Sequence, residues 1–456
     1  MTSNTCDILV TADLHEQLLA HLFPGDDDEH GAILRAGIVQ SGSTLRLLVQ
    51  NVEPAKFGTD YVAGEYGYRA LTPPFIHREI LRCRDLRLAY LAVHNHQGDR
   101  RVDFSKIDLQ SHERGYPALL DIGGGVPVGA LVYGRRSVAA DIWMPDGSRR
   151  SLGTYRIVGR TIKRLYSRPR RPHHSAEIEH DRQIRMFGTS GQDVLRSSKV
   201  AVVGLGGVGS LVAEYLARLG VGTILMIDPD PIDSTNLSRV VGATPVDVEV
   251  GLLKTQIAVR HARELARDTV LQTASRDVAA ESVARTLRDC DFVFLAADSM
   301  RARLVVNAIA HQYLVPTVQI GAKVRPDHAG ELDDAMCAVR HIRPASGCLW
   351  CNGFIDATQL AIESKSDAER KAQAYGVQQP NPSVITMNAV AAAHAVNDFL
   401  FDFLDLTGDQ PPHPYRHIHF LTGSVQGVIP RSNPTCPECV HRLAMGDALE
   451  LPVLAS

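Results

Sequence analysis

The feature that most constrains the fold is a glycine-rich turn between an apolar run and an amphipathic segment near the middle of the chain. Residues 200–204 predict a β-strand and residues 210–219 predict a helix. The turn between them contains four glycines, Gly204, Gly206, Gly207 and Gly209. Glycine lets the backbone turn tightly and approach a phosphate, which the amides and dipole of the helix N-terminus attract. This order predicts a nucleotide site, and on its own it suits NAD as well as ATP.

The residues after the turn continue to alternate between strand and helix. A second strand is predicted at 223–228 and ends at Asp228, 24 residues past Gly204, where an acid can bind the hydroxyls of a ribose. The later elements are a helix at 252–266, a strand at 291–296, a helix at 302–313 and a strand at 316–320. This alternation predicts an α/β, Rossmann-like, doubly wound sheet that is mostly parallel, with helices on both faces.

The first part of the chain has a different pattern, so at least two domains are expected in 456 residues. Its elements predict a mixed α+β domain, with helices at 14–22 and from about 105. The strands are expected at 32–39, 44–51, 86–93 and 126–132. Basic residues, prolines and histidines fill residues 164–178 without apolar periodicity, which is typical of a linker. The predicted division is a domain at 1–160, a linker at 161–178 and a domain at 179–456.

Charge gives no general case for binding nucleic acid or membranes. Lys and Arg number 48 and Asp and Glu 51, for a net charge of −3. The N-terminus has no export signal and the chain has no run of 18 apolar residues, so a cytoplasmic protein without a membrane span is expected. Only eight of the cationic residues are lysines, so a lysine at a motif position is more informative than usual.

Four of the eight cysteines form two C-x-x-C pairs. The pairs are Cys348 with Cys351 and Cys436 with Cys439. Four thiolates close the tetrahedral coordination of one Zn²⁺, so we expect a structural site that ties the C-terminal tail to its domain. Two unrelated pairs or a redox motif are the alternatives. The other four cysteines, Cys6, Cys83, Cys290 and Cys337, are expected to be small core residues.

Several polar residues lie where a triphosphate would need them. Arg239 and Lys254 can neutralise its charge, and Asn236 can donate a hydrogen bond to it. Asp298 follows a predicted strand, at the edge where the ligand crevice of an open sheet lies. The alternative for each charged residue is a surface ion pair, worth about 0–1 kcal/mol.

These motifs, from about Asp181 onward, resemble the ThiF/MoeB/E1 superfamily of activating enzymes. The matching elements, in order, are DRQIRMFG, GLGGVGS, the Asp228-x-Asp230-x(5)-Asn236-Leu-x-Arg239 segment, Lys254 and Asp298. The resemblance implies ATP-dependent adenylation of a carboxylate, with Asp228 on the ribose and Asp298 on Mg²⁺. It also implies that Arg182 reaches the phosphates of a partner subunit in a homodimer, and it supports the zinc site. Arg239 and Lys254 are 15 residues apart, slightly more than the family pattern.

The same resemblance implies a protein substrate, the C-terminal tail of a ubiquitin-like or sulfur-carrier protein. Family members that pass such a protein onward carry a thioester cysteine in the crossover region after the first zinc pair. Residues 352–383 contain no cysteine, and Cys337 lies earlier, in a predicted strand. We therefore expect acyl-adenylate formation without a thioester step in that loop, with direct transfer to a partner's nucleophile. An E2-like protein is a further partner that the resemblance allows.

A second group of chemically active residues lies in the first domain. His94 and His96, at i and i+2 on a strand, point to the same side and can bind one metal ion. Asp108 can supply a third ligand, which leaves an open position for water, and Asp103 is the competing third ligand. Glu29, ahead of another predicted strand, can act as a general base beside that water.

This group resembles the JAMM/JAB (MPN) metalloprotease domain over roughly residues 5–155. The family pattern is an upstream Glu followed by H-x-H-x(7)-S-x(2)-D; here eight residues separate His96 from Ser105. The resemblance implies zinc-dependent cleavage of peptide or isopeptide bonds after ubiquitin-like C-termini, with Glu29 as the base and Ser105 stabilising the oxyanion. The alternatives are ordinary packed histidines or a degenerate domain that only binds a partner.

Together the motifs predict a bifunctional enzyme. The first domain would trim or remove a ubiquitin-like protein, and the second would adenylate the C-terminal carboxylate that this cleavage exposes. One alternative is an adenylyltransferase for a sulfur-carrier or peptide substrate, fused to an inactive JAB-like binding module. The other is an NAD-dependent oxidoreductase, which leaves Arg239, Asp298 and the paired cysteines without a role.

Overall fold

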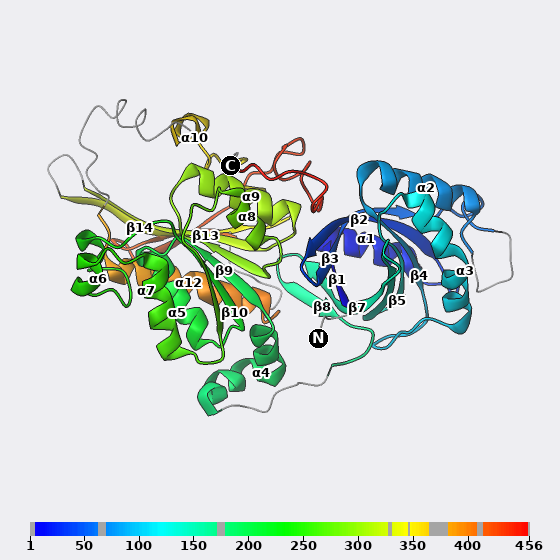
Figure 1. Cartoon of the computed structure of the whole chain (residues 1–456), viewed down its shortest axis with the longest axis horizontal. Coiled ribbons are helices and arrows are strands. Elements are labelled where there is room, and N and C mark those ends of the chain that lie inside the picture. The colour runs from blue at the N-terminus through cyan, green and yellow to red at the C-terminus, as the bar shows by residue number, and fades with distance from the viewer. Residues whose placement is uncertain are drawn as a thin grey trace. The chain divides into compact units, whose positions relative to one another are not determined.

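The computed structural model describes residues 5–62, 70–170, 178–326, 331–344, 347–363, 382–407 and 414–454. It divides into two compact units (Figure 1). The first unit contains Met1–Arg171, Gln312–Leu314 and Arg442–Glu450, and the second contains Pro172–His311, Val315–His441 and Leu451–Ser456. The boundary falls inside the predicted linker, of which residues 171–177 lie outside the described residues.

The first unit is built on an eight-stranded sheet whose order is β1-β3-β2-β4-β5-β6-β7-β8. The strand β1 pairs in parallel with both β3 and β7, so the sheet closes on itself. Closure leaves few unpaired edge groups, which protects a sheet from adding foreign strands. The strands are β1 (Thr5–Thr11), β2 (Gly31–Ser41), β3 (Thr44–Pro54), β4 (Ala89–Asn95), β5 (Val128–Gly134), β6 (Ser137–Trp143), β7 (Arg149–Val158) and β8 (Ile162–Leu165).

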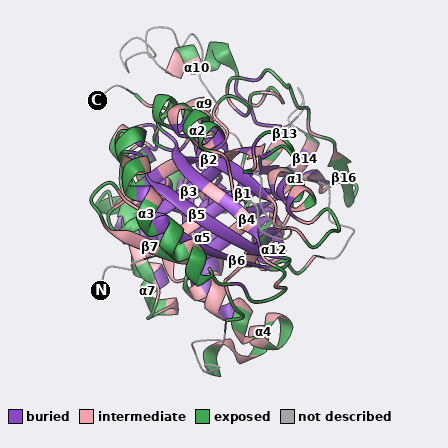
Figure 2. Cartoon of the chain, turned by 90° about the vertical axis from the view of Figure 1, so that its right-hand side faces the viewer, coloured by how far each residue is buried: buried purple, intermediate pink, exposed green. Residues whose placement is uncertain are grey.

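Three helices bury apolar residues against this sheet, on two separate cores. The helix α1 (Ala12–Leu22) places Leu18 and Leu22 in one core with β1, β2 and β3. The helices α2 (Pro73–Leu86) and α3 (Lys106–Gly123) pack against each other and contribute Phe75, Ile80 and Tyr116 to the other core. The strands are mostly buried while these helices present exposed outer faces (Figure 2).

The second unit contains an eight-stranded sheet of order β11-β10-β9-β12-β13-β14-β15-β16. The strands from β11 to β13 pair in parallel, and those from β13 to β16 pair antiparallel. They are β9 (Lys199–Val203), β10 (Thr223–Ile227), β11 (Val270–Ala274), β12 (Phe292–Leu295), β13 (Thr317–Pro326), β14 (Leu332–Ile342), β15 (Tyr415–His419) and β16 (Ser424–Val428).

Helices cover both faces of this sheet, as a doubly wound fold requires (Figure 1). On one face, α5 (Gly207–Arg218) packs between α7 (Lys254–Leu265) and the buried α12 (Ile385–Phe403), while α9 (Met300–Gln312) lies on the other. The remaining helices are α4 (Asp181–Arg196), α6 (Pro245–Glu249), α8 (Glu281–Ala284) and α10 (Ala357–Glu363), with short 3-10 turns η1 (Ile178–His180), η2 (Ser234–Asn236) and η3 (Arg285–Leu287).

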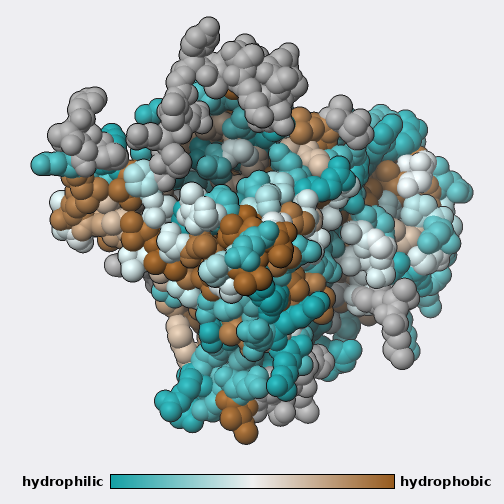
Figure 3. Space-filling view, turned by 60° about the vertical axis from the view of Figure 1, so that its left-hand side comes forward, coloured by the Kyte–Doolittle hydropathy of each residue, from teal (hydrophilic) through white to brown (hydrophobic). Residues whose placement is uncertain are grey.

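The sequence predicted β9, β10, β12 and β13 of the second sheet and a strand around Cys337 in β14, and it missed β11, β15 and β16. β15 has three polar residues among its five and β16 is mostly exposed, so both lack the apolar run that marks a buried strand. The strand expected at 86–93 begins at Ala89, because α2 extends to Leu86. On the face that Figure 3 shows, apolar surface is interspersed with polar surface. Val250 and Ile429 are two exposed apolar residues of the second unit. Among the described residues, no helix is both long and apolar enough to cross a membrane.

Candidate functional site

The glycine turn of the second unit leaves no room for side chains. Gly204 has a φ of +90°, and a Cβ there would lie 2.7 Å from the backbone nitrogen of Ala297. A Cβ on Gly209 would collide with the carbonyl oxygen of Gly204, and one on Gly207 with the side-chain amide of Asn388. The amides at the start of α5 therefore stand open at the carboxyl edge of the sheet, where an anion can approach them.

Asp228, at the end of β10, holds this turn in place. Its two carboxylate oxygens accept hydrogen bonds from the backbone N–H groups of Leu205 (2.7 Å) and Asp230 (2.9 Å). Burial raises the pKa of Asp228, and the charge of Lys254 partly opposes that rise. The ammonium of Lys254 lies 2.9 Å from the Asp230 carboxylate and 3.8 Å from that of Asp228. Asp230 is the exposed member of the pair, so its carboxylate is the more accessible to a ligand.

Arg239 extends from the loop after η2 toward the glycine turn. Its guanidinium donates to the carbonyl of Thr235 at 2.6 Å, and its Cδ lies 3.3 Å from the position of a Cβ on Gly207. Asn236 is buried, and its side-chain oxygen has no hydrogen-bond partner within the described part of the chain.

One cavity of about 1080 Å³ gathers most of these residues. Its lining includes the predicted residues Gly204, Gly206, Gly207, Asp228, Asp230, Arg239, Lys254 and Asp298. Asp298 follows β12 and is exposed to the cavity; its carboxylate forms no hydrogen bond or ion pair with the described residues. Cationic groups, open amides and a free carboxylate at one edge suit a triphosphate with a divalent cation.

Three predicted residues are not part of this lining: Gly209, Asn236 and Arg182. Gly209 permits the close packing of α5 on the turn. Arg182 is exposed on α4, a helix that is kinked at Gly188 (φ +74°). One chain therefore does not bring Arg182 into its own cavity, and its role in a second subunit stays a prediction.

The cavity also contains residues that the sequence analysis missed. They lie on α9, β13, β14, α10 and α12 and include Arg303, Gln319, Gly321, Arg340, Glu363 and Asn388. The Glu363 carboxylate accepts hydrogen bonds from the backbone N–H groups of Met300 (2.9 Å) and Arg301 (3.0 Å) at the start of α9. The packing of strands and helices that are distant in the sequence brings these side chains to the cavity, so no local motif could have identified them.

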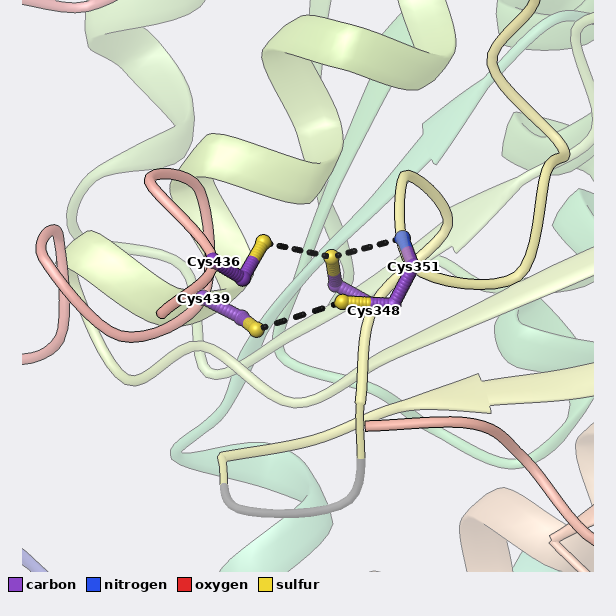
Figure 4. Close-up of side chains that lie close together, drawn as sticks. All are labelled: Cys348, Cys351, Cys436 and Cys439. Atoms are coloured by element: carbon purple, nitrogen blue, oxygen red, sulfur yellow. Dashed lines mark hydrogen bonds between the residues drawn. The ribbon is translucent and has the colours of Figure 1, made fainter. Parts of the chain in front are cut away.

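The four paired cysteines of the second unit converge on one point (Figure 4). The sulfur of Cys348 lies 3.8 Å from that of Cys436, and the sulfur of Cys351 lies 3.8 Å from that of Cys439. Four sulfurs around Zn²⁺ at 2.3 Å would be about 3.8 Å apart, so the geometry fits a tetrahedral site. The interaction with Cys439 lowers the pKa of Cys348 to about 6, which favours a thiolate. Cys337 is buried in β14, as expected of a core residue, and burial raises its pKa to about 11.

In the first unit, His94 and His96 at the end of β4 meet Asp108 on the first turn of α3. The Nε2 atoms of the histidines are 3.2 Å apart, and each lies 3.5 Å from an oxygen of Asp108. Ligands around Zn²⁺ at about 2.0 Å would be about 3.3 Å apart, so these three atoms also fit one metal ion. Asp103 is exposed beside Arg101 and is not part of this cluster.

Glu29 and Ser105 complete the surroundings of this cluster. A carboxylate oxygen of Glu29 lies 3.7 Å from Nε2 of His96, and burial raises the pKa of Glu29. Buried Asn95 holds the Glu29 segment, because it accepts from the N–H of His30 at 2.6 Å; the sequence analysis gave Asn95 no role. Ser105 caps α3: its hydroxyl accepts from the N–H of Asp108, and its own N–H donates back to that carboxylate.

Comparison with known proteins assigns the second unit. The model of the ThiF family matches residues 180–438, which is more than half of the chain. The chain belongs to the ThiF family. This membership argues against an NAD-dependent oxidoreductase. The match begins at residue 180, so the resemblance of the first unit to JAMM/JAB domains stays a prediction.

Relatives of this ThiF-family protein match shorter stretches. It is 33% identical over 130 residues to the "Sulfur carrier protein ThiS adenylyltransferase" of Bacillus subtilis, covering 28% of this chain and 39% of that protein. It is 33% identical over 131 residues to the "SAMP-activating enzyme E1" of Haloferax volcanii, covering 29% of this chain and 48% of that protein. These matches thus span less than half of either relative. A crystal structure of E. coli MccB with MccA-N7isoASN is 20% identical, with a TM-score of 0.47, over 58% of this chain and 75% of that one.

Proposed function

We propose that the second unit is an ATP-dependent adenylyltransferase that activates the C-terminal carboxylate of a ubiquitin-like or sulfur-carrier protein. The observation that carries this proposal is the shared cavity. The free carboxylate of Asp298 faces the same space as the glycine turn, Arg239 and Lys254. Family membership and the similarity to the ThiS adenylyltransferase of Bacillus subtilis support it.

The proposed reaction is an adenylyl transfer in which the protein itself need not form a covalent bond with either substrate. An oxygen of the substrate carboxylate attacks the α-phosphorus of ATP, the bond from that phosphorus to the β-bridging oxygen breaks, and pyrophosphate leaves. No proton is transferred, so the chain's task is to position the two anions and to neutralise their charge.

Each residue at the glycine turn has a role that follows from its surroundings. The open amides of α5 bind phosphate oxygens, and Arg239 and Lys254 reduce the repulsion between the phosphates and an incoming carboxylate. Asp228 fixes the turn, and the Asp228–Asp230 pair would hold the ribose. Asp298 would hold Mg²⁺, whose charge stabilises the departing pyrophosphate.

Exchange of labelled pyrophosphate into ATP tests the proposal. We expect exchange that depends on a ubiquitin-like or sulfur-carrier protein ending in a free carboxylate. Asp298→Asn should reduce it at least about 100-fold, because Mg²⁺ loses its anionic ligand. Asp333→Asn is the matched control, since Asp333 is an exposed acid on β14 that pairs with Arg325. Absence of exchange with any such protein would rule out this function.

We further propose a homodimer in which Arg182 of each chain reaches the ATP of the other. Its support is the exposure of Arg182 on α4 and its absence from the described lining of its own cavity. Mixing Arg182→Ala chains with Asp298→Asn chains tests it: dimers that share active sites recover exchange at one of their two sites, whereas independent monomers recover none.

A second candidate function, zinc-dependent cleavage after the C-terminus of a ubiquitin-like protein, rests on the first unit. It is favoured by the convergence of His94, His96 and Asp108 with a carboxylate, Glu29, beside them. Bound zinc would supply a Lewis acid that activates water. Glu29 would accept the proton of that water, and burial, which raises the pKa of Glu29, makes it a stronger base.

Cleavage of a ubiquitin-like fusion by the full chain separates this function from an inactive binding module. Loss of cleavage in Glu29→Gln, with unchanged zinc content, supports the protease. A chain that binds the ubiquitin-like protein through the first unit but never cleaves it supports the binding module. The ThiF-family match lies within residues 180–438, so the adenylyltransferase is the better supported of the two functions.

A further inference from the structure

The cavity of the second unit extends well past the residues assigned to ATP. Strand register places Val203, Leu295, Gln319 and Arg340 side by side across β9, β12, β13 and β14. Neighbouring strands are about 4.8 Å apart, so the backbone of Arg340 lies about 14 Å from the strand that carries the glycine turn. The ribose residue Asp228 lies on β10, on the opposite side of β9. The β13–β14 end of the cavity is therefore available to the second substrate.

The floor of this end is made of small residues. Gly321 pairs with Ala338 in the antiparallel ladder, next to the pair Gln319 and Arg340. Among the described residues, a Cβ on Gly321 would meet only the side-chain nitrogen of Gln319, at 3.9 Å. Both residues line the cavity. An extended polypeptide can lie over such a floor without collision.

Arg340 lines this end of the cavity and has no acidic partner among the described residues. Its guanidinium donates to the side-chain oxygen of Gln319 at 2.8 Å, contacts Nε2 of His417 at 3.1 Å and stacks 4.1 Å from the ring centroid of Phe354. Within the described part of the chain, it forms no ion pair with a carboxylate, and its buried Nε has no hydrogen-bond partner. Burial lowers the pKa of Arg340 to about 10, and the charge of Arg303 acts in the same direction.

Arg303 adds a second positive charge to the same end. Its guanidinium donates to the carbonyl of Phe354 at 2.9 Å, so Phe354 contacts both arginines. Its buried Nε is likewise without a partner among the described residues, and burial lowers its pKa although Asp298 and Glu363 raise it. Partial burial of two neighbouring guanidinium groups destabilises the folded state unless an anion pairs with them.

We propose that Arg340, assisted by Arg303, binds an acidic side chain near the C-terminus of the polypeptide that the second unit adenylates. The inference rests on the proposed function and adds the substrate class: tails with Asp or Glu a few residues before the terminal carboxylate. An extended chain rises about 3.3 Å per residue, so 14 Å corresponds to about four residues. The acidic residue of the substrate should therefore lie at the third to fifth position from the substrate's C-terminus.

Fluorescent octapeptides that end in Gly-Gly test the specificity. They carry Glu, Gln or Arg at the third, fourth or fifth position from the end and are otherwise identical. Binding to the full chain is measured by anisotropy with a non-hydrolysable ATP analogue bound. We expect one Glu peptide to bind about tenfold tighter than its Gln counterpart, the usual contribution of a charge-assisted hydrogen bond.

The second part of the test removes or reverses the charge of Arg340. Arg340→Gln should remove the preference, and Arg340→Glu should shift it to the Arg peptide, with the affinity for the ATP analogue unchanged within about twofold. Arg325→Gln is the control, because Arg325 is an exposed arginine of β13 paired with Asp333. Unfolding curves of each variant exclude a folding defect.

Equal binding of the peptides, or no binding of any, overturns the proposal. Weaker binding of the ATP analogue to Arg340→Gln also overturns it, because the anion would then be a phosphate. Failure of the proposed function is a separate result: a Glu peptide that binds selectively but releases no pyrophosphate from ATP leaves the recognition site intact and removes the adenylation.

Discussion

The two ligand clusters of this chain differ in accessibility and in donor chemistry. The cysteine cluster of the second unit has four soft ligands, three of them buried, and no vacant position around a tetrahedral metal. The cluster of His94, His96 and Asp108 has three ligands, all half-exposed, with Glu29 beside them. A closed site stabilises a fold, whereas an open one lets a substrate reach the metal. The predictions below test this contrast.

The largest effect should follow from opening the cysteine cluster. Cys436→Ser should release the zinc and destabilise the second unit by roughly 5 kcal/mol, because structural zinc contributes directly to folding. Zinc content and chemical unfolding measure this. Cys290→Ala is the control: Cys290 is buried and is not a member of the cysteine cluster, and its loss should cost about 1 kcal/mol without loss of zinc. An unchanged unfolding midpoint for Cys436→Ser would mean that the cluster is not structural.

Replacing the two histidines of the first cluster should abolish cleavage and leave the fold intact. The double variant His94→Ala and His96→Ala should lose one of two bound zinc ions and all cleavage of a ubiquitin-like fusion. Its free energy of unfolding should change by less than about 1 kcal/mol, because the two side chains are partly exposed and belong to no apolar core. His77→Ala, on the exposed face of α2, is the matched control. A wild-type chain with a single zinc would contradict the prediction.

Acid should weaken both units through buried neutral histidines. Burial lowers the pKa of His15 in the first unit, and of His311 and His341 in the second, to about 4. Because an unfolded histidine titrates near 6.5, each contribution is complete above that pH and is lost as pH falls from 6.5 to 4. With two such residues, the second unit should lose stability more steeply.

The variant His15→Gln isolates the first unit's part of this effect. It should reduce the slope of unfolding free energy against pH by up to about 1.4 kcal/mol per pH unit between pH 6.5 and 4. Urea unfolding at several pH values measures the slope, with His77→Gln as the exposed control. An identical slope in His15→Gln and the parent chain would show that His15 titrates normally.

The smallest effect should come from two capping boxes, that of Ser105 in the first unit and that of Thr244 in the second. Ser105→Ala and Thr244→Ala should each cost about 1 kcal/mol, because each removes an acceptor from a helix N-terminus. Only Ser105→Ala can change cleavage, since Thr244 belongs to the second unit. Equal stability loss with full cleavage would reduce Ser105 to a helix cap, and a selective loss of cleavage would support its role at the oxyanion.

Local spacing made some of the sites predictable. The glycine turn, the cysteine pairs and the histidine pair each lie within a few residues, so their geometry follows from a single turn or strand. Asp108 was predictable because it lies in the first turn of a helix whose start is indicated by the capping residue Ser105. The position of Asp298 was predictable for the same reason, because it follows a short strand that is wholly apolar.

Residues brought together by distant strands escaped the sequence analysis. Arg340 reaches the cavity because β14 turns back antiparallel along β13, and no pattern around residue 340 shows that reversal. Asn95 separates two predicted ligands, but its bond to the N–H of His30 depends on the pairing of β2 with β4. The segment around α12 is apolar on several faces, so periodicity does not define which neighbours it packs against.

The cysteine cluster also changes how the chain is connected. Between Cys351 and Cys436 lie 84 residues, and they include α12, β15 and β16. A metal that joins the two pairs makes this stretch a closed ring within a linear polypeptide. A single proteolytic cut inside the ring would leave both fragments held together until a chelator removed the metal. The ring carries Asn388, which lines the cavity, and His417, which contacts the lining residue Arg340, so part of the cavity's surroundings lies on a loop whose closure depends on that metal.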